Sequence, residues 1–143
     1  MALFCLKAFR VKTKQEKLIS AVTAAVRHLE ESLKRISEES NGDMSGLVWR
    51  AAADLEYALF LFSIMHQDGS EKSSWKLGAQ SRETEVESVT VSARDLLKEA
   101  ESRIKADELH EAHKNAWMAR GYLLKLQQFF DKKEKLRKAA AKS

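Results

Sequence analysis

The densest group of residues that could carry out chemistry lies between positions 107 and 113. His110 and His113 are three residues apart, with Asp107 before them and Glu111 between them. Residues three apart share a helix face, so two imidazoles and a carboxylate could approach one zinc or iron ion. Against this, a helix N-terminus disfavours a cation, and no second helix offers a matching pair of carboxylates. We therefore predict neither a metal site nor a cofactor.

No other motif indicates an enzyme. The sequence has no glycine-rich phosphate loop, serine elbow or paired-carboxylate motif. Its one cysteine, Cys5, cannot form an intrachain disulfide or supply a Cys-based zinc module, and no histidine is near it in sequence. These features favour a non-enzymatic protein in a reducing, cytoplasmic compartment, and the longest apolar run is too short for a transmembrane segment.

Apolar periodicity predicts the helices that would position these groups. The 143 residues are 44% hydrophobic and 32% charged and include no proline, which favours a folded helical chain over a disordered one. Apolar spacings of three and four predict helices at about 15–40 and 46–66, from Val86 to Ile104, and from an Asp107 cap to about 130, with a loop at 67–80. The second helix is apolar all round at 57–62, so we expect it to be the most buried.

These helices predict one all-α domain with the topology of an antiparallel up-down-up-down four-helix bundle. The chain would comprise an N-terminal arm at 1–14, a bundle at 15–130 and a basic C-terminal tail at 131–143. In that topology the first helix begins, and the fourth helix ends, at the same pole. Both basic extensions would therefore emerge side by side.

The fourth helix combines small and large apolar side chains. Three alanines on its main stripe predict a close approach to a neighbouring helix, and they are Ala112, Ala116 and Ala119. Its remaining apolar side chains exceed what a bundle corner requires and predict contact with a partner chain, such as a homodimer. These interface residues are Trp117, Met118, Tyr122 and Phe129.

Charge is separated along the chain. The net charge is +4, but both chain ends are strongly basic and residues 18–124 carry more acidic than basic groups. A pooled basic pole would attract nucleic acid or an acidic protein surface, with membrane-surface binding a weaker alternative. It would use Lys7, Arg10, Lys12, Lys14, Lys132, Lys133, Lys135, Arg137 and Lys138. Alternatively, lysines gather at a helix C-terminus simply because the helix dipole favours cations there.

Residues 92–130 read as a helix, a tight turn and an Ala-rich helix, SARDLLKEAESRIKADELHEAHKNAWMARGYLLKLQQFF. This segment resembles the paired helices of HEPN domains, helical bundles that often act on or bind RNA. It is also similar to uncharacterised archaeal helical-bundle families, for which no activity follows. In HEPN ribonucleases an Arg and a His carry the cleavage. The resemblance thus implies that Arg103 holds the phosphate and His110 deprotonates the 2′-hydroxyl or stabilises the transition state, although Ile104 stands where those enzymes place a polar residue.

Three functions follow from these features. The first is a non-enzymatic accessory or scaffold protein that binds nucleic acid or an acidic partner through the basic pole. The second is a protein-interaction module that forms a dimer or a hetero-complex. The third is a HEPN-like ribonuclease. The low cysteine content and abundant mixed charge are also typical of a thermophilic source.

Overall fold

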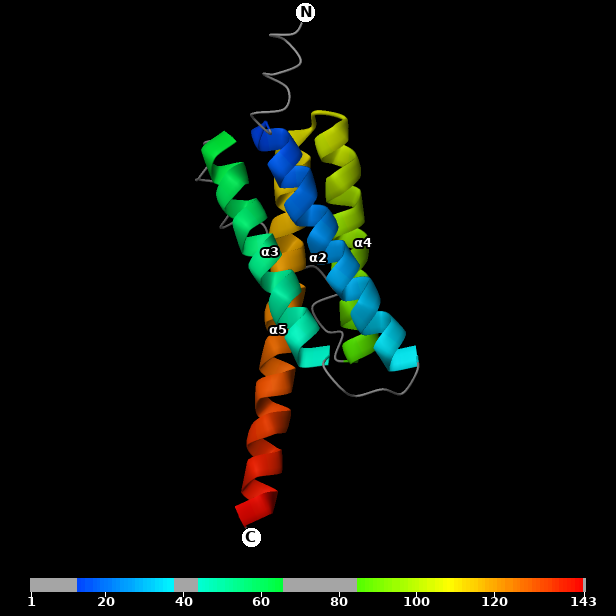
Figure 1. Cartoon of the computed structure of the whole chain (residues 1–143), viewed down its shortest axis with the longest axis vertical. Helices are drawn as coiled ribbons and strands as arrows, with labels where there is room; N and C mark the ends of the chain where they lie inside the picture. The colour runs from blue at the N-terminus through cyan, green and yellow to red at the C-terminus, as the bar shows by residue number, and fades with distance from the viewer. Residues whose placement is uncertain (1–12, 38–43, 66–84, 143) are drawn as a thin grey trace, which may run out of the picture.

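The computed structural model describes residues 13–37, 44–65 and 85–142, and the described residues form four helices and no strand. The helices are α2 (Lys14–Ser37), α3 (Met44–Met65), α4 (Val86–Lys105) and α5 (Leu109–Lys142). The prediction of an all-α four-helix bundle is confirmed (Figure 1). The predicted arm residues Lys7, Arg10 and Lys12 and the predicted loop at 67–80 lie outside the described residues.

Each helix buries one side in a common core. Helix α2 packs against α3 and α4, and α5 packs against the same two helices, so α2 and α5 lie on one diagonal of the bundle and α3 and α4 on the other. The largest fully buried side chains come from all four helices and include Leu18, Leu29, Leu55, Phe62, Leu97, Ile104, Tyr122, Leu123 and Leu126. Burial of these apolar groups is the main stabilising contribution to the fold.

Contacts between helices show that the predicted up-down-up-down topology is wrong. The side-chain amide of Gln15 in α2 donates to the backbone oxygen of Ile104 in α4 at 2.8 Å, so the start of α2 lies beside the end of α4. Glu56 in α3 pairs with Arg120 in α5, and both α3 and α4 run antiparallel to α5. Helices α3 and α4 are therefore parallel to each other, and the order is down, up, up, down (Figure 1).

The length of the second connection, between α3 and α4, allows this difference. Consecutive helices that run parallel need a connection that spans a full helix length, about 33 Å for the 22 residues of α3 at ~1.5 Å per residue. Residues 66–84 supply more than enough chain, since an extended residue covers ~3.3 Å. Loop length alone therefore permitted both topologies.

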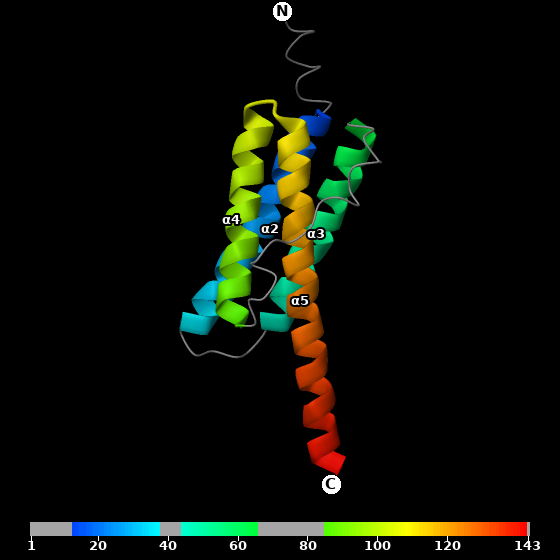
Figure 2. The same ribbon diagram turned by 180° about the vertical axis from the view of Figure 1, so that it is seen from behind.

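The topology separates the two basic regions. Lys14 begins α2 at one end of the bundle, whereas α5 ends at the opposite end (Figures 1 and 2). The predicted single basic pole is therefore wrong, because the described part of the N-terminal basic region and the C-terminal one lie at opposite ends. Any anion bound by residues 131–142 would be held by α5 without help from Lys14.

A tight turn joins α4 to α5. Asp107 has a φ of 63°, and its backbone N–H donates to the Ile104 oxygen at 3.0 Å, while that of Glu108 donates to the Arg103 oxygen at 2.8 Å. Asp107 therefore occupies the left-handed position that ends α4, which Asp tolerates better than most residues, rather than the predicted cap of the following helix. The turn fixes α5 antiparallel to α4.

The alanines predicted to allow a close helix approach, Ala112, Ala116 and Ala119, are all fully buried. Replacing Ala116 with Leu would insert three carbon atoms where no space is left for them. We expect Ala116→Leu to lower the free energy of unfolding by about 1–3 kcal/mol. Urea denaturation followed by circular dichroism measures this loss, and an unchanged midpoint would show that α5 does not approach its neighbours closely at this position.

Candidate binding surfaces

The histidines of the candidate metal cluster lie in different environments. His113 is fully buried, and its ring stacks on Phe62 of α3 with centroids 4.9 Å apart and planes 5° apart. Asp107 is exposed in the α4–α5 turn. In the described part of the chain, no three His, Cys, Asp or Glu side chains come together in a way that could hold a metal ion. The hypothesis that His110, His113 and Asp107 share one ion is therefore wrong, because His113 faces the core.

Arg103 and His110 lie near each other along the chain at the α4–α5 turn. The guanidinium of Arg103 donates to Glu99 at 3.1 Å and to Glu108 at 2.8 Å. The hydrogen bond to Glu99, reinforced by Glu108, raises the pKa of Arg103 above its ordinary value. Glu99 and Glu108 thus already bind the Arg103 guanidinium, which the HEPN resemblance predicts to bind a phosphate. His110 is half-buried in the first turn of α5, and Ile104 is a core residue.

The predicted interface residues of α5 do not share one surface. Tyr122 is fully buried and contributes to the core, so its prediction as an interface residue is wrong. Trp117 and Met118 are half-buried, and the Arg120 guanidinium lies 5.2 Å from the Trp117 ring. Phe129 is 43% exposed and meets the ring of Phe130 edge-on at 5.7 Å. Because α5 packs against both α3 and α4, its buried side is wider than its main apolar stripe.

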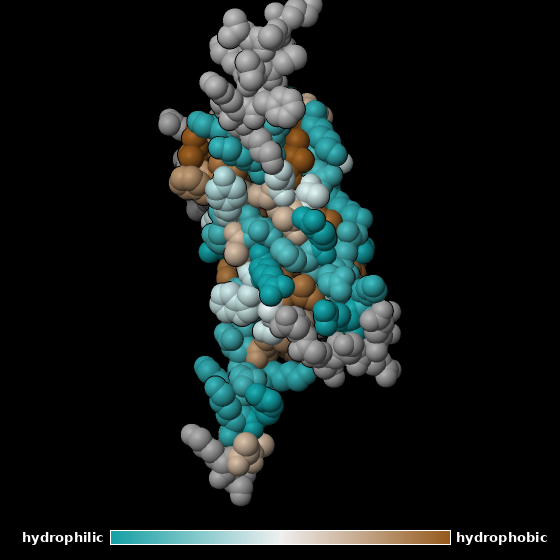
Figure 3. Space-filling model, viewed as in Figure 1, coloured by the Kyte–Doolittle hydropathy of each residue, from teal (hydrophilic) through white to brown (hydrophobic). Residues whose placement is uncertain are grey.

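Four of the seven large hydrophobic side chains that are exposed in the described part of the chain lie on α3, the helix predicted to be the most buried. Trp49 is 53% exposed and Phe60 is 60% exposed, and Tyr57 and Ile64 are also exposed. These side chains lie on one side of the helix with Ala53, and we call the set Trp49, Ala53, Tyr57, Phe60 and Ile64 the α3 stripe. Brown, hydrophobic side chains are visible at the upper end of α3 in Figure 3. Among the described helices, α3 packs extensively against α2 and α5, and neither of these covers this side.

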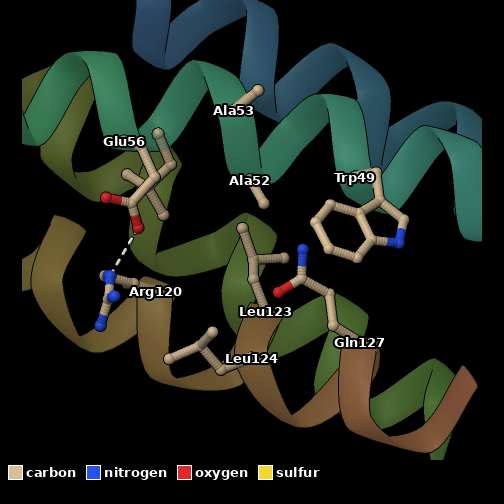
Figure 4. Close-up of a pocket in the computed structure, with 9 residues that line it drawn as sticks. Trp49, Ala52, Ala53, Glu56, Arg120, Leu123, Leu124 and Gln127 are labelled. Atoms are coloured by element: carbon tan, nitrogen blue, oxygen red, sulfur yellow. Dashed lines mark hydrogen bonds and ion pairs between the residues drawn. The ribbon is translucent and has the colours of Figure 1, made fainter. Parts of the chain in front are cut away.

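A groove runs beside the α3 stripe, between α3 and α5 (Figure 4). It has a volume of about 250 Å³, and leucines of α5 face alanines of α3 across it. The ion pair between Glu56 and Arg120 closes one end, and Trp49 and Gln127 lie at the other. Among the described lining residues, the charged ones are Glu56 and Arg120, which pair with each other, so the groove suits apolar groups.

A third surface is the end of α5 that projects beyond the bundle, residues 131–142, which we call the α5 extension (Figures 1 and 2). Five cationic residues on it are exposed, namely Lys132, Lys133, Lys135, Arg137 and Lys138. Glu134 accepts a hydrogen bond from Arg137 at 2.7 Å, which holds the pKa of this carboxyl below its usual value. The extension is thus a helix with a clear excess of positive charge.

Comparisons with protein-family models, with curated protein sequences and with solved structures found no match to this chain. Among the described helices, none combines the length and the apolar character that crossing a membrane requires.

Proposed function

We propose that this protein is a non-enzymatic helical scaffold that binds the phosphate backbone of nucleic acid through the α5 extension. The observation that carries this proposal is a projecting helix with five exposed cations and two acidic residues, one of which already pairs with Arg137. Cations within reach of several phosphates release condensed counterions, and this release drives binding that does not depend on base sequence.

The chemistry of the extension favours phosphates over a single shaped acidic surface. Four of its five exposed cations are lysines, which act as point charges, whereas Arg137 alone could form a bidentate contact. At ~100° per residue, positions 132, 133, 135, 137 and 138 lie around most of the helix circumference instead of forming one face. Such a helix suits a flexible or grooved polyanion, and contacts of this kind position a protein without reading sequence.

The net negative charge of residues 18–124 also favours binding of an anion at the α5 extension. Residues 18–124 carry more acidic than basic groups, so the bundle repels a polyanion that the extension attracts. No contact favours the alternative of RNA cleavage, because Glu99 and Glu108 already hold the Arg103 guanidinium. We therefore expect RNA to bind and to remain intact.

Fluorescence anisotropy tests this proposal with labelled duplex DNA and single-stranded RNA, each titrated at 50 and 200 mM salt. We expect both to bind and their affinities to fall steeply with salt. Undetectable binding at low salt, or binding that salt does not weaken, would contradict the proposal. So would binding of polyglutamate in preference to both nucleic acids, which would indicate an acidic protein partner. RNA shortened by the wild type but not by His110→Ala would support the ribonuclease alternative.

A further inference from the structure

The geometry of the α3 stripe points to a second copy of this chain as its partner, and we propose that two chains pair through α3 as an antiparallel homodimer. This inference is independent of nucleic-acid binding. It rests on the exposed side chains of α3, on their spacing and on the neutral ion pair beside them.

Four of the five stripe residues are placed symmetrically about the point between Glu56 and Tyr57, and Tyr57 would lie opposite the partner's Glu56. Trp49 lies as far before this midpoint as Ile64 lies after it, and Ala53 and Phe60 are likewise equidistant from it. A two-fold axis through the midpoint would therefore place Trp49 opposite the partner's Ile64 and Ala53 opposite the partner's Phe60. An isologous interface requires this kind of self-complementary pairing, whereas contact with a different protein does not.

The pair of Ala53 and the partner's Phe60 also combines a small side chain with a large one. The small side chain of Ala53 leaves space for the ring of the partner's Phe60, which is 60% exposed in the monomer. This contact occurs twice in a symmetric dimer. Large side chains opposite small ones let two helices approach closely, as they do inside bundles.

The exposed area is of the right order for an interface. Aromatic side chains bury about 150–250 Å² each, so three that are about half-exposed contribute roughly 300 Å² of apolar surface. Ile64 and the neighbouring Leu124 of α5 add to this surface, and the stripe extends along ~22 Å of helix from Trp49 to Ile64. A standard interface buries about 800 Å² per partner, and the polar rim of α3 and α5 would supply the rest.

Charge does not oppose burial of this surface. The stripe itself contains no charged residue. Glu56 flanks it on the side of α5, where that carboxylate is already paired with Arg120 of the same chain, and the exposed Arg50 flanks it on the other side. Glu56 and Arg120 would enter the interface as a neutral pair. Burying one of these charges without its partner would cost much more free energy.

The proposed pairing also sets the position of the two α5 extensions. Each extension projects from the end of the bundle at which α3 begins. Because the two copies of α3 would be antiparallel, the extensions would lie at opposite ends of the dimer. A dimer could therefore contact two separated segments of a polyanion.

Disulfide trapping tests the pairing directly. In a Cys5→Ser background, Ala53→Cys chains mixed with Phe60→Cys chains and oxidised should form a cross-linked dimer. Neither variant alone should cross-link, since seven residues separate the two positions by ~10 Å along the helix, beyond the ~7 Å Cα separation that a disulfide bridges. Equal cross-linking by a single variant, or none in the mixture, would overturn the antiparallel register.

Sedimentation equilibrium gives an independent test that does not depend on oxidation. The wild type should be a dimer, and Phe60→Glu should be a monomer with an unchanged circular dichroism spectrum, because position 60 is exposed in the folded monomer. The control Leu136→Glu changes a residue that is 64% exposed on the α5 extension and should remain a dimer. A monomeric wild type would overturn the proposal and would indicate that the α3 stripe binds a different protein. A dimer that dissociates equally in both variants would also overturn it.

Discussion

Phe62→Ala will lower the free energy of unfolding by about 3–5 kcal/mol, whereas Phe60→Ala, two positions earlier on the same helix, will lower it by less than about 1 kcal/mol. Phe62 is fully buried and stacks on the ring of His113, so removing its ring leaves a cavity between α3 and α5. Phe60 is 60% exposed, and its ring contributes little to the core.

Urea denaturation measures both losses, at a protein concentration low enough that self-association does not contribute. The pair is well matched, because both changes remove the same side chain from the same helix. Equal losses would mean that a different side of α3 faces the core. A larger loss for Phe60→Ala would contradict the assignment of the α3 stripe as a surface.

Replacing the five exposed cations of the α5 extension with Gln will weaken nucleic-acid binding by about 10²–10⁴-fold at 0.1 M salt, the range expected for the loss of up to five phosphate contacts. Gln retains good helix propensity, so the change removes charge while the extension stays helical. Anisotropy titration with the same labelled duplex measures the loss.

The control variant removes the same number of positive charges from the bundle. It replaces five exposed cations with Gln, and they are Lys17, Arg27, Lys34, Arg50 and Lys114. Since the net charge of the two variants is equal, a difference between them reports where the nucleic acid binds. An equal loss in both would indicate that only total charge matters, and the α5 extension would not be a specific binding surface.

Helix formation was predictable because periodicity is a local property. The described bounds of α2, α3 and α4 lie close to the predicted ranges, since apolar residues at spacings of three and four define each buried face. Helix α5 continues to Lys142, well past the predicted end near 130. The apolar pattern ends there and most residues of the extension are exposed, but good helix formers such as Lys, Glu, Leu and Ala continue.

Topology was not predictable from the same signals. Periodicity shows which side of a helix is buried but not which neighbour covers it. The Gln15 contact with Ile104 shows the direction of α2 relative to α4. The groove that has Glu56 and Arg120 at one end and Trp49 and Gln127 at the other shows that of α3 relative to α5, and all these contacts join residues far apart in the chain. The predicted basic pole depended on those directions, and it failed for that reason.

The two errors in burial have a common cause. Helix α3 is apolar around most of its circumference, so its sequence does not distinguish the buried Phe62 from the exposed Phe60. On α5, Tyr122 and Phe129 both lie outside the main stripe, yet only Tyr122 is buried. In both helices, burial depends on which neighbouring helices are present, and this information is not local.

The salt dependence of nucleic-acid affinity tests the central claim most directly. For the wild type and both charge variants, the association constant for one duplex is measured between 50 and 300 mM salt. If the five cations of the extension contact phosphates, their replacement should reduce the slope of log K against log salt by about 4 to 5, close to ~0.9 for each lost contact, and the control variant should keep the wild-type slope. A slope unchanged by the extension variant would contradict binding through the end of α5.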